Sequence, residues 1–395
     1  MIPPLAAVAL GWALVAGTVE LEAIRRSVLR RRARGKSGAV GVLAAEAARA
    51  ARVLLVRPCA GRDPWLEEAL RSLAGAARSF TVTCRLAVAD AADGAHEPAC
   101  AAAAALRALG LDASVVITGA RGPNRKAAQL AAVVAAERAP YDVVLIVDGD
   151  VDLAGMDLDA LVGPLASRPE LGVVWAPPVE AGHARTLGDR ASAAVLGGSL
   201  HAFPLLAGLD RRGLVGKVFG VRRDALAAVG GFDALVSHLG EDMELARRLR
   251  AIGRAVEPAS LVARSMASGR SWAQAEARFG RWISVIRAQR GALLWTYPLL
   301  FFPTLPILVL AAMAAAGAPA PAAIAAIVAV VMRLAVAAAA APGSRPSWRR
   351  AAVDAALADA LLAGAFARAL RSRRVVWRDV ALTIERGGLL RAEEA

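Results

Sequence analysis

Alternating carboxylates follow an apolar run in the middle of the chain: Asp148, Asp150 and Asp152 come directly after residues 143–147. Apolar, mostly β-branched residues in a row are typical of a strand that is buried on both faces of a parallel sheet. Ligands of open α/β sheets collect beyond the carboxyl ends of the strands, and carboxylates separated by one small residue can hold a hard divalent cation on a diphosphate. We therefore predict that Asp148 and Asp150 bind a metal ion.

Two other interpretations of this motif compete with a metal bound to a diphosphate. A calcium-binding EF-hand loop begins with the same spacing of aspartates, but it requires glycine where Leu153 stands and a helix rather than a strand before the loop. The second is a polar turn that only ends a core strand, which an isolated Asp-x-Asp motif does not exclude. The motifs further along the chain favour the metal.

Asp242 stands where a predicted helix over residues 243–252 begins, and Leu245 and Leu249 form the apolar stripe of that helix. A helix N-terminus favours the ionised form of a carboxyl group, which is the form that a general base or a metal ligand needs. We therefore expect Asp242 to be ionised and available for chemistry.

A second predicted helix, over residues 271–289, carries Arg278 and Arg281. Residues three apart share a face of a helix, so the two guanidinium groups can converge on one anion, with Trp282 beside them as a flat wall. The alternative is a solvated basic face with one buried tryptophan, because short motifs constrain function only loosely.

The elements that must position these residues alternate between strand and helix. Strands are predicted at 53–58, 82–88, 114–117 and 143–147, with helices from 63, over 99–109 and over 127–138 between them. Further along, a helix at 158–166 and strands at 172–175 and 216–223 follow. Such βαβα alternation predicts an α/β domain with a doubly wound, mostly parallel sheet over residues 50–290.

Composition places part of the chain in a membrane. The 395 residues are 57% hydrophobic, with a mean hydropathy of +0.48, which is too apolar for a purely soluble enzyme. The net charge of +14 is carried mainly by arginines at 25–34, 345–350 and 368–378, beside apolar segments, which favours an anionic membrane surface as partner and argues against nucleic acid. Three scattered cysteines lack metal-ligand spacing, so neither a disulfide framework nor a zinc site is indicated, and a reducing compartment fits: Cys59, Cys84 and Cys100.

An uncharged apolar run at residues 2–19 is long enough to span a bilayer. Six arginines follow it and should stay on the cytoplasmic side: Arg25, Arg26, Arg30, Arg31, Arg32 and Arg34. A cleaved signal peptide would carry its basic residues before the apolar run, so we predict an uncleaved anchor over residues 1–22. This expectation places the α/β domain in the cytosol of a cell with a bacterial-type inner membrane.

The chain becomes apolar again over residues 291–395, which we predict to be a membrane region with a basic tail. Residues 292–317 and 321–341 form two spans, and the loop after them carries Arg345, Arg349 and Arg350, so the positive-inside rule predicts a hairpin that returns to the cytoplasm. The segment 353–370 holds Asp354 and Asp359 in its apolar face, and it can cross, re-enter or lie along the surface.

In their order, these motifs resemble the family-2-like glycosyltransferases, and most closely the ceramide glucosyltransferase group with its bacterial relatives. That group shows three separated aspartate sites followed by (Q/R)-x-x-R-W, which match here Asp90 or Asp93, Asp148 with Asp150, Asp242, and Arg278-Phe-Gly-Arg281-Trp282. Two further segments also resemble that group: Arg57-Pro58-x-x-Gly61-x-Asp63-Pro64 and Asn124-Arg125-Lys126. The match covers roughly residues 50–300. The first aspartate site is poorer in acids than is usual for the group, so either Asp90 or Asp93 can fill it.

The resemblance implies a GT-A catalytic domain, with a Rossmann-like, mostly parallel sheet flanked by helices, between an N-terminal anchor and C-terminal membrane helices. It implies inverting transfer from a nucleotide-sugar, UDP-glucose or similar, to the hydroxyl of a membrane lipid such as a ceramide-like or hopanoid acceptor. Within it, Asp148 and Asp150 would hold Mg²⁺ or Mn²⁺, and Asp242 would be the general base.

The remaining site residues also take roles from the resemblance. Asp90 or Asp93 would recognise the uracil or ribose, and Asn124 and Lys126 would bind the nucleotide-sugar together with Asp148. Arg278 and Arg281 would pair with the departing phosphates, and Trp282 would line the acceptor or diphosphate side.

Two other functions stay open. A processive polysaccharide synthase shares the aspartates, but it usually has glutamine where Arg278 stands, and two or three C-terminal spans make too slight a tunnel for a polymer. A non-catalytic nucleotide-sugar or lipid-binding membrane protein would leave Asp242 and the metal pair without a task.

Overall fold

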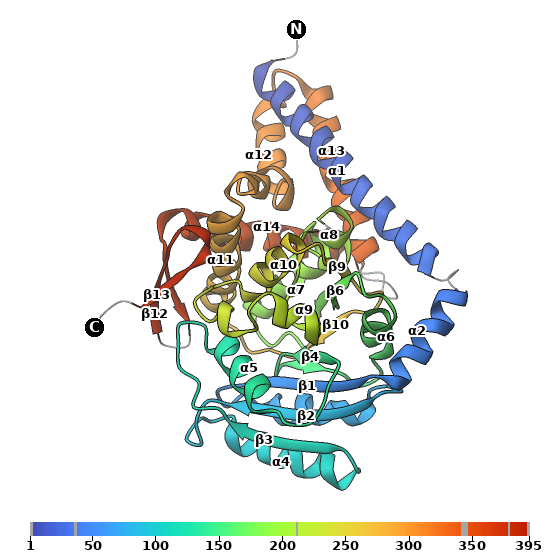
Figure 1. Ribbon diagram of the computed structural model, residues 1–395. Helices are drawn as coiled ribbons and strands as arrows, with labels where there is room; N and C mark the ends of the chain where they lie inside the picture. Colours follow the sequence, from blue (N-terminus) through green and yellow to red (C-terminus); the bar gives the residue numbers. More distant parts are fainter. Residues whose placement is uncertain (1–2, 35–37, 211, 341–346, 378–379, 393–395) are drawn as a thin grey trace.

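The computed structural model describes residues 3–34, 38–210, 212–340, 347–377 and 380–392 (Figure 1). Its centre is a seven-stranded sheet with the strand order β3-β2-β1-β4-β8-β6-β9. These strands are β1 (Arg52–Cys59), β2 (Thr81–Val88), β3 (Asp112–Ile117), β4 (Val143–Val147), β6 (Leu171–Trp175), β8 (Val218–Arg222) and β9 (Ala255–Pro258).

Alternate residues of the central strands enter two separate cores, which is why strand β4 reads as an uninterrupted apolar run. Val143, Leu145 and Val147 pack on one face of the sheet, and Val144 and Ile146 pack on the other. The first face is covered by α3 (Leu66–Arg71), α4 (His96–Ala108) and α6 (Asp159–Ser167), and the second by α5 (Arg125–Ala136), α9 (Arg223–Ala228) and α10 (Glu241–Ala251). The predicted α/β class with a mostly parallel sheet is confirmed.

Strand β8 departs from a purely parallel sheet, because it runs antiparallel between β4 and β6. Its register pairs Val218 with Val147, so the residue before β8 lies beside the residue after β4. The backbone amide of Asp148 donates to the carbonyl of Lys217 over 2.8 Å. The reversed strand therefore brings Lys217 to the edge of the sheet where the predicted metal ligands stand.

The remaining short elements frame this edge. A small sheet joins β5 (Val151–Asp152), β10 (Ala263–Ser265) and β7 (Pro178–Glu180). A C-terminal sheet joins β11 (Arg374–Trp377), β12 (Val380–Ile384) and β13 (Leu390–Ala392). Helices α2 (Gly38–Ala50), α7 (Leu187–Gly198), α8 (Phe203–Leu209) and α11 (Trp272–Gln289) complete the α/β part, with single 3₁₀ turns at Ser72–Gly75, Asp233–Leu235, Gly291–Leu293 and Arg386–Gly388.

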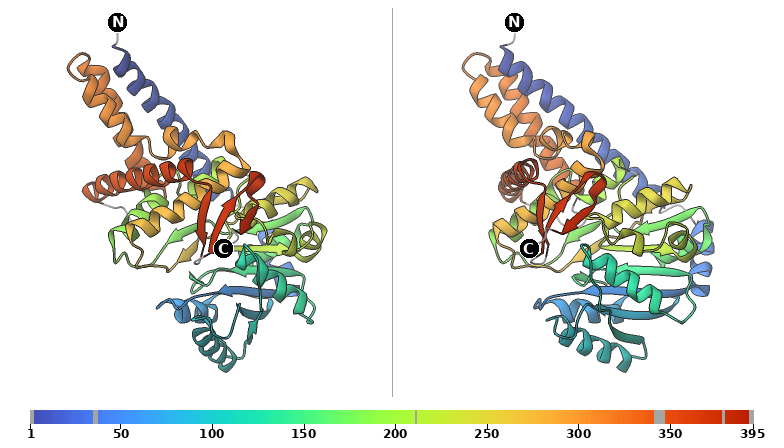
Figure 2. Two further views of the ribbon diagram at one scale, coloured as in Figure 1. Left: turned by 90° about the vertical axis from the view of Figure 1, so that its left-hand side faces the viewer. Right: turned by 60° about the vertical axis from the view of Figure 1, so that its left-hand side comes forward.

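Three helices project together from the α/β part: α1 (Pro4–Arg34), α12 (Thr304–Ala314) and α13 (Pro319–Ala340) (Figures 1 and 2). Among the described residues, three segments are long and apolar enough to cross a membrane, namely Pro4–Arg30, Leu187–Leu209 and Pro319–Ala340. The second of them comprises α7 and α8 and is largely packed against other elements. Helix α14 (Trp348–Arg371) lies across the base of the projecting helices, against α7 and α11 (Figure 2).

The apolar segment at 292–317 differs from the single span that its composition predicts. A π-helical turn at Tyr297–Phe301 precedes α12, whose 11 residues rise only about 17 Å, about half of a hydrocarbon core. Pro298, Pro303 and Pro306 explain the break, because proline removes a backbone donor and clashes with the preceding turn. Arg345, which the positive-inside argument used, lies outside the described residues.

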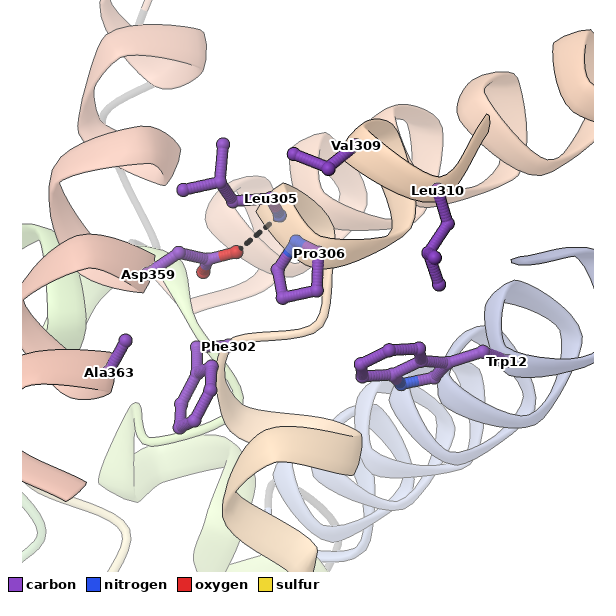
Figure 3. A pocket seen from close by; sticks show the side chains of 8 residues that line it. All are labelled: Trp12, Phe302, Leu305, Pro306, Val309, Leu310, Asp359 and Ala363. Carbon is purple, nitrogen blue, oxygen red and sulfur yellow. Dashed lines mark hydrogen bonds between the residues drawn. The ribbon is translucent and has the colours of Figure 1, made fainter. Parts of the chain in front are cut away.

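Asp359, one of the two acids in the apolar face of the segment 353–370, forms a buried ion pair with Arg333. Arg333 of α13 and Asp359 of α14 are 2% and 1% exposed, and their side chains lie 2.9 Å apart. Asp359 also accepts a hydrogen bond from the amide of Leu305 over 2.8 Å, at the start of α12 (Figure 3). The pair therefore ties α13, α14 and α12 together, beside an apolar groove of about 410 Å³ that Trp12 of α1 closes on the other side.

Candidate functional site

A cavity of about 880 Å³ lies where the carboxyl ends of β1 and β4 meet the beginnings of β8, α5 and α10. Eight residues predicted from the sequence line it: Asp93, Lys126, Asp148, Asp150, Asp242, Arg278, Arg281 and Trp282. The fold thus brings segments that are far apart in the chain to one place. The other two predicted residues, Asp90 and Asn124, are not among its lining residues.

Hydrogen bonds from the buried side chain of Arg57 hold the backbone of the turn between Asp148 and Asp150. This guanidinium is fully buried and donates to the carbonyls of Ala69 over 2.6 Å, Asp148 over 3.0 Å and Val151 over 2.6 Å. Gly149 fits closely here, because a Cβ at this position would make tight contacts, 3.2 Å from Leu66 and 3.3 Å from the carbonyl of Pro58. With its backbone occupied in this way, the turn presents its carboxylates to the cavity.

Asp148 and Asp150 converge on one cationic position, which the ammonium of Lys217 occupies. Lys217 Nζ lies 2.6 Å from both carboxylate oxygens of Asp150 and 3.2 Å from Asp148 Oδ2. Ser265 Oγ also donates to Asp150 over 2.6 Å. Burial alone would raise the pKa of Asp150, but Lys217 and Ser265 hold that pKa well below its usual range. The shared ammonium shows that one cation can meet both carboxylates.

Two carboxylates alone make an incomplete metal site. Across the part of the chain that the structure describes, no cluster of three or more His, Cys, Asp or Glu side chains is placed to hold an ion. A hard divalent cation takes about six oxygen ligands, so an ion between Asp148 and Asp150 needs further oxygens from a bound phosphate or water. The donor set therefore fits a metal that arrives on a diphosphate.

Asp242 lies in the first turn of α10, with backbone amides on both carboxylate oxygens. Gly216 N donates to Oδ2 and Met243 N donates to Oδ1, each over 2.7 Å. Gly216 allows this approach, because a Cβ there would lie 3.1 Å from Asp242 Oδ2 and 3.2 Å from Lys126 Nζ. Burial, and next to it the charge of Glu241, raise the pKa of Asp242 to about 7. The helix N-terminus, which we expected to favour the ionised form of Asp242, is outweighed by burial and by the charge of Glu241.

Asn124 does not line the cavity, and its buried side chain supports the residues that do. It is fully buried, caps α5 by accepting from Ala127 N over 3.0 Å, and donates to His238 O over 2.7 Å and to Glu241 Oε2 over 3.0 Å. Its amide thus joins the start of α5 to the segment that carries Asp242. Lys126, two residues on, does reach the cavity, where its ammonium lies 2.7 Å from Asp148 and 3.3 Å from Glu241.

Arg278 is occupied by a carboxylate that sequence reasoning missed. It forms an ion pair with Glu180 of β7, donates to Ser192 Oγ over 3.0 Å, and lies 4.7 Å from the centre of the Trp282 ring. Arg281 is one turn further along α11 and also lines the cavity. The predicted pair of arginines therefore shares one wall, with Arg278 braced by Glu180.

Asp93, and not Asp90, faces the cavity. Its Oδ1 accepts from the amides of Gly61 over 2.7 Å and Ala95 over 2.9 Å, which joins the loop after β1 to the loop after β2. Asp90 is exposed and caps its own turn by accepting from Ala92 N over 2.8 Å. The structure thus distinguishes two residues that the sequence left equal.

Another wall of the cavity, which adjoins Arg278 through Trp282, is apolar and aromatic. Trp282 packs in this wall against His201 at 5.8 Å and Phe203 at 5.6 Å between ring centres. The other members of this wall are Leu206, Ala207, Val285, Ile286 and Tyr297. Helix α8 in this wall packs against α1, where Arg30 donates to the carbonyl of Ala207 over 2.6 Å. The apolar wall therefore lies next to the root of a helix long enough to cross a membrane.

Lys217 is a further residue of this site that the sequence interpretation passed over, because it was assigned only to a strand. A signal was present in the composition. Only three of the chain's 48 basic residues are lysines, and the two within the described residues, Lys126 and Lys217, both contact Asp148. A rare residue type gathered on one carboxylate indicates a local chemical requirement.

Comparison with known proteins places the chain in a family. The model of glycosyl transferase family 21 matches residues 8–390, whereas no curated protein sequence matches. Glucosyl-3-phosphoglycerate synthase from Mycobacterium tuberculosis is a similar solved structure. Its complex with Mn²⁺, UDP and glucosyl-3-phosphoglycerate gives 17% identity, 63% of this chain and 84% of that chain covered, and a TM-score of 0.37. Its complex with Mn²⁺ and UDP-glucose gives 16% identity, with 62% of this chain and 82% of that chain covered, and a TM-score of 0.36.

Likeness at that level does not decide the donor or the acceptor. The family match, in contrast, runs from α1 through the cavity to the C-terminal sheet and so includes every residue of the site. The chain belongs to glycosyl transferase family 21 and is a glycosyltransferase.

Proposed function

We propose that this glycosyltransferase moves a sugar from a UDP-sugar, UDP-glucose or similar, to the hydroxyl of a membrane lipid, with inversion at the anomeric carbon. One observation carries the proposal: the same cavity has a charged wall at the edge of the sheet and an apolar, aromatic wall at the root of α1. A nucleoside diphosphate suits the first wall and a lipid suits the second. Asp242 lines the same cavity, so a donor and an acceptor bound there could both reach it.

The charged wall accommodates the donor. Asp93, at the end of the cavity nearest β1 and β2, would recognise the uracil or ribose. Lys126 and Arg281 supply positive charge for the phosphates, and a planar guanidinium suits two phosphate oxygens at once. Because Asn124 is buried, we propose that it does not contact the nucleotide. Its role would be to hold Glu241 and the segment that carries Asp242 in position.

Asp148 and Asp150 are the residues that would hold Mg²⁺ or Mn²⁺, since one cation already meets both carboxylates in the form of Lys217. When bound, such an ion supplies Lewis-acid neutralisation of the diphosphate leaving group. The protein's own contribution is to hold the turn still, through Arg57, and to keep Asp150 ionised, through Lys217 and Ser265.

Asp242 accepts the proton of the acceptor hydroxyl as that oxygen attacks the anomeric carbon. A pKa of about 7 suits a general base, because a substantial fraction of the group is ionised near neutral pH and that fraction takes up a proton readily. The amides of Gly216 and Met243 hold both of its oxygens, so its orientation is set before the acceptor arrives. A single base and a single displacement give inversion.

The apolar wall receives the lipid. Phe203, Trp282 and Tyr297 provide aromatic surface next to the root of α1, so a lipid can remain partly in the bilayer while its hydroxyl reaches Asp242. Arginines at the foot of α1 favour the cytoplasmic face of a bacterial-type inner membrane, which would place residues 50–290 in the cytosol with the nucleotide-sugars.

A processive polysaccharide synthase is the competing function within the same superfamily, and one assay separates the two. Membranes that contain the protein are incubated with radiolabelled UDP-sugars and a lipid extract, and the label is followed into organic solvent, insoluble polymer or neither. We expect label in the organic phase, absent with Asp242→Asn. Label in polymer would favour the synthase, and label in neither would favour a non-catalytic binding protein.

A further inference from the structure

We propose that Lys217 is a built-in counter-cation that occupies the metal position until a nucleoside diphosphate is bound, so that this chain takes up a divalent metal and a diphosphate together. The inference rests on the proposed function, because it concerns the same cavity. It adds a residue that controls when the metal can enter.

The geometry shows that the ammonium and a metal ion exclude each other. Lys217 Nζ lies 2.6 Å from both oxygens of Asp150, so it covers that carboxylate symmetrically, and Ser265 takes a further position on Oδ2. Asp150 is only 8% exposed. An ion that approaches from the cavity therefore reaches Asp150 only after the ammonium has moved away.

The ammonium of Lys217 needs a new anionic partner when it leaves Asp150. A buried ion pair that loses one partner is strongly destabilised, because the remaining charge is left without compensation. Metal alone would free the Lys217 ammonium without offering it a new anion. A diphosphate in the same cavity offers that anion, because Lys217 lines the cavity beside Lys126. Metal and diphosphate binding should therefore be coupled through this side chain.

The residue type agrees with this role. The chain uses lysine only three times among 48 basic residues, yet a lysine stands at this position. The backbone of Lys217 is fixed beside Asp148, because its carbonyl accepts from Asp148 N over 2.8 Å. A compact ammonium on a flexible stem can then turn from Asp150 to a phosphate without moving the strand, whereas a planar guanidinium would be bound in one orientation.

The test measures Mn²⁺ binding by electron paramagnetic resonance on the purified full chain, with and without UDP, and needs no turnover. For the wild type we expect weak Mn²⁺ binding alone and an affinity raised by UDP, with a coupling of about 5–150-fold, as is typical between linked ligands. Lys217→Met and Lys217→Gln should bind Mn²⁺ alone about tenfold more tightly, and UDP should then raise the affinity much less.

Arg264→Met is the matched control. It also removes one positive charge, from the neighbouring carboxylate Asp152, to which Arg264 is paired outside the cavity. Its Mn²⁺ binding should equal that of the wild type. Unchanged Mn²⁺ affinity in both Lys217 variants, with UDP-dependent binding intact in the wild type, would overturn the inference and leave the proposed function standing. Absence of Mn²⁺ binding to the wild type even with UDP would instead overturn the metal assignment.

Discussion

Replacing Asp242 by asparagine separates donor binding from chemistry. The change keeps the size of the side chain and removes the proton acceptor. Loss of a general base typically lowers the rate by about 10²–10⁴-fold, or about 2.7–5.4 kcal/mol of transition-state stabilisation. Asp242 contacts backbone amides of Gly216 and Met243 and is not one of the two proposed metal ligands, so UDP affinity should stay near the wild-type value.

The structural cost of the same change is smaller and can be measured separately. Asparagine offers one acceptor oxygen where aspartate offers two, so the amide of Gly216 or of Met243 loses its partner. An unsatisfied buried donor costs about 1–3 kcal/mol of stability. Thermal unfolding should therefore shift slightly downward while calorimetry with UDP stays unchanged.

The pH dependence gives an independent measurement of the same residue. The pKa of Asp242 is raised to about 7, so the carboxyl group is protonated and inactive as a base below that pH. The wild-type kcat/KM should rise with pH through about 7 and then level off, because this quantity reports groups of the free enzyme. Asp242→Asn should lose this rising limb.

Arg281→Ala should differ from Asp242→Asn in the same two assays, because it should lower both UDP affinity and turnover. Arg281 lines the cavity and is proposed to pair with the phosphates, so its removal should weaken UDP binding as well as slow the transfer. If Asp242→Asn lost UDP affinity or kept turnover within tenfold of the wild type, the general-base assignment would be wrong. Asp242 would then be a structural residue that receives the amides at the start of α10.

Four further outcomes follow from the structure. Glu241→Gln should move the acid limb of kcat/KM to lower pH, because the charge of Glu241 helps to raise the pKa of Asp242; an unmoved limb in the pH profile would contradict this cause. Asp150→Ala should abolish transfer in a folded, membrane-inserted protein, and excess EDTA should stop the wild type; full turnover in EDTA would refute the metal assignment. Arg57→Met should lower the free energy of unfolding by roughly 2–5 kcal/mol in denaturant titration, because three carbonyls lose their donor, and an unchanged midpoint would show that water replaces it. Cysteines introduced at exposed positions of residues 50–290 should resist a membrane-impermeant reagent in intact cells, and labelling there would contradict the cytosolic orientation.

Local pattern predicted the strands and helices that carry the site. Strand β4 was predictable because both faces of a central strand are buried, which leaves an uninterrupted apolar run in the sequence. The local sequence also indicated the break in the segment at 292–317, through Pro298, Pro303 and Pro306, although composition alone favoured a single span. The direction of β8 could not be predicted from the sequence, because an apolar strand shows the same pattern whether it runs parallel or antiparallel to its neighbour.

The charge states in the site depended on contacts that no local pattern contains. Lys217 meets Asp150 across 67 positions of sequence, and only the reversed strand β8 makes that contact possible. The helix N-terminus is a local feature that favours an ionised Asp242, whereas burial acts only through the fold and, together with the adjacent Glu241, raises the pKa of Asp242. Sequence reasoning therefore located the carboxylates, but their different protonation could be derived only once their neighbours were known. That difference lets two similar side chains take opposite tasks, since Asp150 stays charged to meet a cation while Asp242 can accept a proton.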